Sequence, residues 1–565
     1  MTVRQLFLYF RTARHLKPSQ LFYFLLRRST KHRNVRVEQT PTLRSTQRLV
    51  TPYPIAGILV NESTFRFLNV ESDLLDENGE IDWSAPSHQR LWNYNLHYFD
   101  FLRETYRSSE NRDRLIRSWI LRNPQGLDVA WEPFTTSLRI VNWIFYLRQR
   151  PSCDIPQDWL DSLFVQACWL EKNDERHVLA NHYFENLKAL FFAGCFFDGT
   201  HAARWLKRAQ KEIPEQLEEQ ILADGGHYER SPQYHCLMLE NYLDIYNFAQ
   251  SYPDICTEPF VEAVKSYAVR SLNWLANTNF PDGTIPLFND SAFGVAISPF
   301  DLFAYAERLS LKFHRLSGTS FELIDQPDSG FFGCRLRDDM FIIDCGDIGP
   351  RYQPGHTHCD FLSYELMFKN QRVVVDTGVC EYEPGPTRAY VRSTEAHNTV
   401  SVSGGEQSEL WEAFRVARRA KKLYASIEKA GNELLFRGAY RGFYTVGRRI
   451  EHHRTAQVSL TKVGTNIRSV AINDRVTGHG HHTVESFIHF NPAISLIPHD
   501  SGLIEIRADS LRIASVQFDD NIQYQVVPSM FCPEFGKQIP NQTLVLTHSG
   551  RLPISLGYRI VRDLD

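Results

Sequence analysis

The sequence predicts an α+β protein with two large domains, a helical domain followed by an antiparallel β-sandwich. The chain has 565 residues, which is enough for several domains. Up to about residue 325 the apolar residues recur at three- and four-residue spacing, whereas beyond about residue 326 they follow a period of two. The 43% of hydrophobic residues can fill a large core, so a disordered chain is excluded.

Residues 1–60 form a basic, aromatic segment with no acidic residue before Glu38. Arginines interrupt its apolar residues too often for a secretory signal or a spanning helix. We therefore expect a cytoplasmic protein. The segment either lies on an anionic membrane surface, at the inner face of the membrane, or packs as a basic helix on the body of the protein. An organellar transit peptide is a third alternative.

Residues 61–325 are assigned to the helical domain. Helical spacing is clearest over 158–172, 181–197 and 261–278. Proline and glycine interrupt the pattern at 123–124, 151, 224–226 and 281–283. Helices of this length separated by short breaks indicate stacked helical hairpins, arranged either as a solenoid or as a closed toroid.

Residues 326–565 are assigned to the β-sandwich, and the boundary is expected near 324–330. β-Branched and apolar runs occur at 340–344, 372–376, 397–402 and 543–547. Strands that follow one another without intervening helices indicate antiparallel sheets packed face to face.

Composition narrows the functional class. The net charge of −4 gives no overall electrostatic basis for binding nucleic acid. Aromatic residues make up 13% of the chain, which suits stacking on sugar rings as well as filling a core. The ten cysteines form no CxxC pair, a pattern typical of free thiols in a reducing compartment.

Two motifs of the helical domain could carry chemistry. In Asn181-His182-x-x-Glu185, helical spacing places the amide, the imidazole and the carboxylate on one face, where they could bind an acid and move a proton. The alternative is helix capping beside a solvated His/Glu pair. The second motif, residues 224–235, is a glycine-containing loop that presents Tyr228, Tyr234 and His235 before a helix. Its tyrosines could equally serve packing.

A third motif, residues 352–360, contains His356 and His358, and Asp376 and His397 follow on the next predicted strands. On adjacent strands, His358, Asp376 and His397 would form a zinc site with a vacant fourth position. A buried histidine–aspartate network is the alternative.

Aromatic residues mixed with polar ones suggest a sugar cleft that binds a carboxylate through arginine, although helical aromatics are mostly core. These residues are Trp92, Asn95, His97, Trp131 and Arg139.

Taken in order, the motifs resemble the heparinase II/III-like polysaccharide lyases over roughly residues 85–490. The resemblance rests on Asn-His-x-x-Glu, Asp-Gly-Gly-x-x-Glu-x-Ser-x-x-Tyr-His, Gly-His-x-His-x-Asp, Val-Val-Asp-Thr-Gly and Arg-Ser-Thr-x-Ala-His-Asn-Thr-Val. It implies an incomplete (α/α) toroid followed by an antiparallel β-sandwich. It also implies β-elimination at a uronic acid of an acidic polysaccharide.

The resemblance assigns roles to individual residues. Asn181, assisted by Glu185, would bind the uronate carboxyl group. His182 or His356 would remove the C5 proton, and Tyr234 would protonate the leaving O4 or serve as both acid and base. A cationic neighbour, His235 or Arg230, would help the Tyr234 phenol to act as a base. Tyr228 is an alternative to Tyr234, and Arg392 opens the last motif as a substrate-binding residue.

By the same resemblance, His358, Asp376 and His397 would hold a structural zinc, and no organic cofactor is expected. The basic N-terminus resembles that of family members from exopolysaccharide or capsule biosynthesis. A non-catalytic glycan-binding scaffold is therefore one alternative function. A glycoside hydrolase using Glu185 and Glu229 is another. The sequence does not indicate an oligomeric state.

Overall fold

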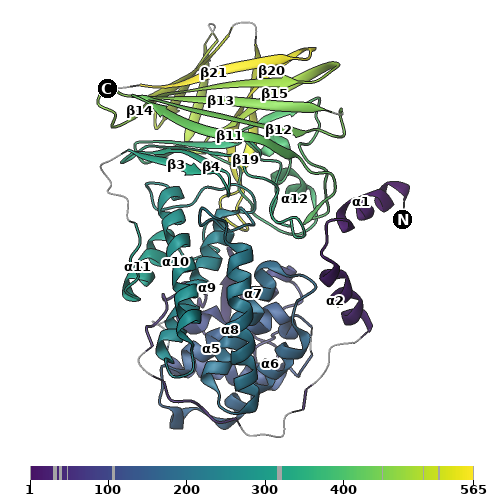
Figure 1. Ribbon diagram of the computed structural model, residues 1–565, viewed down its shortest axis with the longest axis vertical. Coiled ribbons are helices and arrows are strands. Elements are labelled where there is room, and N and C mark those ends of the chain that lie inside the picture. Colours follow the sequence, from purple (N-terminus) through teal and green to yellow (C-terminus); the bar gives the residue numbers. More distant parts are fainter. Residues whose placement is uncertain are drawn as a thin grey trace.

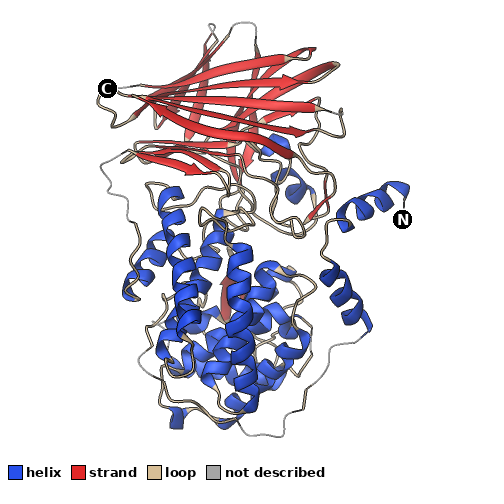
Figure 2. Ribbon diagram, in the orientation of Figure 1, coloured by secondary structure: helices blue, strands red, loops and turns tan. Residues whose placement is uncertain are grey.

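The structure, a computed structural model, describes residues 2–29, 35–36, 41–46, 49–104, 108–126, 128–314, 321–447, 449–499, 502–519 and 522–563. Figures 1 and 2 show a helical domain next to a layered β domain, with two N-terminal helices at one edge of the molecule. This arrangement confirms the predicted order, in which the helices precede the antiparallel sheets.

The helical domain is built from hairpins in which inner and outer helices alternate. The inner helices are α5 (Pro133–Leu147), α7 (Ala180–Phe196) and α9 (Pro232–Ser251), and they bury nearly every residue. The outer helices are α6 (Gln157–Asn173), α8 (Thr200–Gln220) and α10 (Glu258–Thr278). Helix α8 buries one stripe and exposes a charged face, as expected for a helix in contact with water.

Shorter elements complete the helical domain. A hairpin of β1 (Thr64–Phe67) and β2 (Val70–Asp73) packs beside α3 (Arg90–Tyr98). The remaining helices are α4 (Ser109–Arg122), α11 (Pro299–Arg308) and, within the β domain, α12 (Pro386–Val391). The N-terminal helices are α1 (Val3–Ala13) and α2 (Pro18–Ser29). No described helix is both long enough and apolar enough to span a bilayer.

The β domain contains three larger antiparallel sheets. The five-stranded sheet consists of β3 (Glu322–Gln326), β4 (Phe331–Arg335), β5 (Met340–Asp344), β6 (Tyr364–Phe368) and β7 (Gln371–Val374). The four-stranded sheet has the order β19 (Gln523–Phe531), β20 (Ile539–Arg551), β15 (His481–His489) and β8 (Val400–Val402).

The eight-stranded sheet has the order β11 (Lys421–Ala430), β12 (Glu433–Gly442), β13 (Ile450–Leu460), β14 (Ile467–Thr477), β21 (Ile554–Arg562), β18 (Leu511–Phe518), β17 (Leu503–Ala508) and β16 (Ile494–His499). A two-residue pair, β9 (Leu410–Trp411) and β10 (Arg415–Val416), lies apart from these sheets.

The five-stranded sheet joins the two domains because both of its faces are buried. Met340 and Ile342 of β5 belong to the core shared with the helices. Phe341 and Ile343, the alternate residues of the same strand, belong to the core shared with the eight-stranded sheet. Figure 1 shows β3 and β4 between the helices and the large sheet. The helical domain therefore meets the β domain across a continuous apolar contact, which fixes the residues at their junction.

Candidate active site

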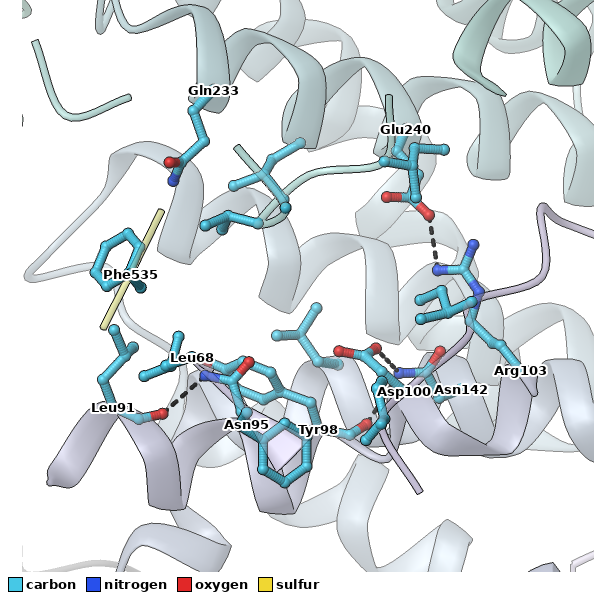
Figure 3. Close-up of a pocket in the computed structure, with 18 of the residues that line it drawn as sticks. Leu68, Leu91, Asn95, Tyr98, Asp100, Arg103, Asn142, Gln233, Glu240 and Phe535 are labelled. Carbon is cyan, nitrogen blue, oxygen red and sulfur yellow. Dashed lines mark hydrogen bonds and ion pairs between the residues drawn. The ribbon is translucent and has the colours of Figure 1, made fainter. Parts of the chain in front are cut away.

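A cavity of about 490 Å³ lies at the junction of the two domains. Helices α3, α5, α7 and α9 supply half of its lining residues, and Tyr382 and Phe535 of the β domain close one side. Figure 3 shows Gln233 and Phe535 at one end of this cavity, and Arg103 and Glu240 at the other. The cavity is large enough for a sugar ring and combines aromatic with polar walls, as small-molecule sites do.

Asn181 lines this cavity from the first turn of α7. The two preceding residues, Leu179 and Ala180, have φ values of 64° and 53°, in the left-handed region that non-glycine residues rarely adopt. Such strain is typical of functional sites. The Asn181 side-chain amide has no hydrogen bond to any described residue, although the residue is only 8% exposed. Its donors and acceptor are therefore available to a ligand.

Tyr234 lines the same cavity from the first turn of α9. Ser231 caps this helix by accepting the Tyr234 backbone N–H at 3.2 Å, and Pro232 occupies the first turn. The Tyr234 hydroxyl lies 3.4 Å from the Tyr382 hydroxyl. Burial, together with the neighbouring Tyr382, raises the pKa of Tyr234 well above its usual value. The resting phenol is therefore protonated.

His356 supports Tyr234 from behind. Its imidazole stacks on the phenol with 3.8 Å between ring centroids. Nδ1 lies 2.9 Å from the Asp290 carboxylate, and Nε2 lies 3.3 Å from Glu229. Burial raises the pKa of Glu229, partly offset by His356. Both imidazole nitrogens therefore face carboxyl groups of the protein, and only the ring face is turned toward the tyrosine.

Asp290 is the centre of a buried charge network. Arg388 donates two hydrogen bonds to it, one of 2.8 Å from Nη2, and His358 Nε2 lies 2.8 Å from its other oxygen. Burial alone would raise the pKa of Asp290, but Arg388 and the two imidazoles hold it well below its usual range. Arg388 also lies 4.9 Å from the ring centroid of Tyr382. A cation thus stands behind the tyrosine pair.

The opposite end of the cavity is rich in carboxylates. Five acidic and three basic residues line the cavity. Each basic residue is already paired: Arg66 with Glu71, Arg103 with Glu240, and Lys188 with Asp244. Figure 3 shows the Arg103–Glu240 pair and the contact of Asp100 with Asn142. Burial raises the pKa of both Asp100 and Glu185.

The structure brings some of the predicted site residues together. Asn181, Tyr234, Glu185 and Asn95 line the cavity, and His356 contacts Tyr234. Glu185 accepts a hydrogen bond from Asn241, and Asn95 donates one to the Leu91 carbonyl oxygen. His182 does not line the cavity. Its Nδ1 lies 3.1 Å from Glu175 and its ring packs on Phe134, while its side chain stays 36% exposed.

The prediction that four residues of the helical domain bind sugar is wrong, because all four are core residues: Trp92, His97, Trp131 and Arg139. Trp92 and Trp131 donate to backbone carbonyl oxygens, and His97 accepts the Trp119 indole N–H at 3.1 Å. Arg139 is fully buried, donates to Gln166 at 2.8 Å and stacks on Trp119. These polar groups satisfy one another inside the hairpins, so none of the four reaches the cavity.

Three further predictions are corrected. Tyr228 is buried against Tyr352, with 3.0 Å between the hydroxyls. His235 lies 3.0 Å from the Ser271 carbonyl oxygen and stacks on Trp274. Arg392 donates to the carbonyl oxygens of Thr357 and Glu412.

Arg230, expected beside Tyr234, instead donates to the carbonyl oxygens of residues 328, 329 and 347. The cation behind the tyrosines is Arg388, not Arg230 or His235.

The predicted zinc residues share one buried region. His397 Nδ1 lies 2.9 Å from Asp376, and the rings of His358 and His397 have centroids 5.3 Å apart. His358 Nδ1 and His397 Nε2 are buried without a hydrogen-bond partner. Within the described part of the chain, however, no three histidine, cysteine or acidic side chains form a group that could hold a metal ion. As placed, Asp376 binds His397 rather than completing a ligand set.

Several functional groups were missed by reasoning from the sequence. Asp290, Arg388 and Tyr382 form the network behind Tyr234, but they lie 56, 154 and 148 residues from it. Asn289, next to Asp290, has a positive φ of 55°, but this backbone conformation is a feature of the structure and not of the sequence. A single sequence cannot show that such distant residues meet.

Comparison with known proteins identifies the family. The family described as "Heparinase II/III N-terminus" matches residues 2–299, and "Heparinase II/III-like, C-terminal" matches residues 319–559. The chain belongs to the heparinase II/III-like family.

Two curated relatives are similar in sequence to part of the chain. The chain is 21% identical over 384 residues to a "Heparin-sulfate lyase" of Bacteroides stercoris, covering 57% of this chain and 55% of the relative. It is 23% identical over 318 residues to one of Pedobacter heparinus, covering 50% and 46%. The matches thus span about half the length of these curated relatives.

A crystal structure of heparinase III superposes with a TM-score of 0.66 at 15% identity, covering 86% of this chain and 80% of that one. A heparan sulfate lyase structure from Pedobacter heparinus superposes with a TM-score of 0.58 at 16% identity, covering 88% and 81%. At such identities the superpositions show that the fold is shared.

Proposed function

We propose that the protein is a polysaccharide lyase that cleaves a uronate-containing glycan by β-elimination. The observation that carries the proposal is the unpartnered amide of Asn181 facing the same cavity as the phenol of Tyr234. The names of its relatives, heparin-sulfate lyases, support this reaction class.

The elimination needs three groups around one sugar. Asn181 donates its amide hydrogens to the uronate carboxylate, which stabilises the negative charge that develops when the C5 proton leaves. Tyr234 is the proton-transfer group, because its phenol lines the cavity and no histidine does so among the lining residues. The protonated phenol gives its proton to O4 as the C4–O4 bond breaks, and the phenolate oxygen so formed takes the C5 proton, which leaves a C4–C5 double bond and a protonated Tyr234.

The surroundings of Tyr234 fit this double role. The raised pKa makes the phenol a weak acid, so its phenolate, once formed, is a strong base. Tyr382 can donate a hydrogen bond to that phenolate, and Arg388 lies behind Tyr382. His356 is then a positioning residue, which keeps the phenol ring in place by stacking.

The charges of the cavity favour a substrate with few sulfate groups. Acidic residues outnumber basic ones on its wall, and the basic residues are all engaged by carboxylates. A sulfate would therefore find no free cation among the lining residues and would meet like charges. The proposed substrate is a uronate polymer with neutral or amino-sugar neighbours, and an unsulfated exopolysaccharide fits this description.

Incubation with uronate polymers tests the proposal. An unsulfated uronate–hexosamine polymer and its sulfated counterpart would be compared by ultraviolet absorbance of the unsaturated uronate and by product mass. We expect absorbance to rise on the unsulfated polymer, with products that have not gained water. Products that have gained water would instead identify a hydrolase, and no product on any uronate polymer would favour a binding scaffold.

The hydrolase alternative is not favoured by the geometry. It requires two carboxyl groups that flank the bond, and the sequence offered Glu185 and Glu229. Glu185 lines the cavity, but Glu229 lies behind it against His356. The expected pair therefore does not face a common substrate.

A structural zinc remains a proposal. The two buried nitrogens without partners, His358 Nδ1 and His397 Nε2, are the kind of donors that zinc binds, and Asp376 contacts the other nitrogen of His397, Nδ1. When bound, zinc would brace the β domain and would not take part in the chemistry. Elemental analysis should find about one zinc per chain, and His397→Ala should lose it.

The cytoplasmic location of the protein also stays a prediction.

A further inference from the structure

Helices α1 and α2 lie along one edge of the molecule, beside the junction of the two domains (Figure 1). They contact both domains. Helix α1 packs on the loop that carries β9 and β10, where Trp411 donates to Thr12 and Arg11 pairs with Glu409 at 3.1 Å. Helix α2 packs on residues 177 and 178, just before the strained entry to α7. Helices α1 and α2 together therefore connect the two domains across their junction.

The helices are attached by their polar residues. Gln20 is 4% exposed and donates to the Val178 carbonyl oxygen at 3.2 Å. Arg27 lies 2.9 Å from His177, and Lys17 pairs with Glu219 and lies over the Tyr352 ring. In an ordinary surface helix such groups face water and the apolar residues face the core. Here much of the polar side of the two helices contacts the rest of the protein.

Apart from the buried Leu8, the valine, leucine and phenylalanine residues of both helices face outward instead. We call them the N-terminal apolar face; it consists of Val3, Leu6, Phe7 and Phe10 of α1, and of Leu21, Phe22, Phe24, Leu25 and Leu26 of α2. Their exposed fractions range from 40% to 70%. The α1 members recur at helical spacing on one stripe, opposite the contacts of Thr12 with the β domain. A group of nine exposed apolar side chains on two successive helices marks an interaction site.

Charge indicates what this surface binds. Residues 2–29 contain six arginine or lysine residues and no acidic residue. Arg4, Arg14 and Arg28 make no ion pair with any described residue. A basic segment with exposed leucine and phenylalanine matches an anionic lipid surface, where arginine meets the headgroups and the apolar side chains enter the acyl boundary. A second copy of this chain would bring like charges together.

We propose that the N-terminal apolar face docks the protein on an anionic membrane surface. The helices are 11 and 12 residues long, too short to span the roughly 30 Å hydrocarbon core and suited to lying in the plane of the interface. Helix α2 binds the Val178 carbonyl oxygen, next to Leu179, and α1 packs on the loop that contains Phe414. Because the helices are attached to both sides of the cavity, docking fixes the cavity in a constant orientation to the membrane.

Vesicle flotation with the full chain tests this proposal. Phosphatidylcholine vesicles would be compared with vesicles that also contain phosphatidylglycerol. The wild type should float with the anionic vesicles and dissociate as salt is raised. The triple variant Phe10→Ser, Phe22→Ser, Leu25→Ser should bind them at least about tenfold more weakly. These side chains are 69%, 62% and 65% exposed, so their loss should leave the fold intact.

A matched control removes equally exposed apolar side chains elsewhere. Phe300, Leu121 and Val463 are 74%, 83% and 83% exposed, and their replacement by serine should leave vesicle binding unchanged. The proposal is overturned if the wild type fails to float, if it floats equally with neutral vesicles, or if the two triple variants bind alike. It is also overturned if the wild type is a dimer that the first variant converts to a monomer, since the face would then cover a second copy.

Discussion

The imidazole of His356 packs on the face of the Tyr234 phenol, with 3.8 Å between centroids and a tilt of 30° between ring planes. Both imidazole nitrogens are turned toward carboxyl groups, Asp290 and Glu229. The histidine is therefore placed to hold the tyrosine ring rather than to take a proton from a ligand.

This relationship predicts a difference between two variants of His356. Phenylalanine can keep the ring contact, whereas alanine removes it. We expect His356→Phe to lower kcat by about tenfold and His356→Ala by at least about a hundredfold. Initial rates on the unsulfated polymer, with thermal unfolding as a check on folding, measure the difference. Equal losses in the two variants would mean that the imidazole itself is the base.

Asn181 is predicted to act through its amide hydrogens. Asn181→Ala removes the hydrogen bonds to the uronate carboxylate and should lower kcat/KM by about a hundredfold. Asn181→Asp adds a like charge at the same place and should lower it further. The additional loss should be larger at low ionic strength, because salt screens the repulsion. Activity in Asn181→Asp equal to that of the wild type would remove the carboxylate-binding role.

The network around Asp290 is predicted to stabilise the junction. Arg388→Met leaves Asp290 buried without its guanidinium partner and should lower the free energy of unfolding by about 3–5 kcal/mol. The exposed pair Arg437–Glu428 is the control, since Arg437→Met should change it by less than about 1 kcal/mol. Urea unfolding measures both. Similar small effects would show that the Asp290 network contributes little.

The folded state is predicted to lose stability in acid because of His97. Burial, helped by Arg139, lowers the pKa of His97 to about 3, whereas the unfolded chain titrates near 6.5. Below about pH 6.5 the unfolded state therefore binds the extra proton, so stability falls as the pH falls toward 3. From pH 7 to pH 5 this loss amounts to about 2 kcal/mol. His97→Gln, compared by urea unfolding at the two pH values, should show a correspondingly smaller drop. An unchanged drop would contradict this origin.

Much of the fold could be predicted from the sequence. The inner helix α7 is apolar on nearly every side, and the strand Met340–Asp344 is buried on both faces, so both patterns identify their elements. The motif residues Asn181 and Tyr234 line one cavity, because each is placed by the first turn of its own helix. Such local signals remain visible in a single sequence.

The rest of the site depends on contacts between distant residues. Trp131 and Arg139 have the composition of a sugar cleft, but Arg139 finds its partners in Trp119 and Gln166 and stays in the core. Conversely, Arg388 gives no sign in the sequence that it will meet Asp290. Side-chain pairing across elements decides which polar residues reach the cavity, and spacing along one element does not encode it.

The most direct test compares two tyrosines on α9. The hydroxyl of Tyr234 faces the cavity, whereas that of Tyr242, two turns further along the helix, is buried without a hydrogen-bond partner among the described residues. The release of unsaturated uronate should fall by at least about a thousandfold in Tyr234→Phe and remain unchanged in Tyr242→Phe. If Tyr234→Phe keeps wild-type activity, the proposed role of the phenol is wrong.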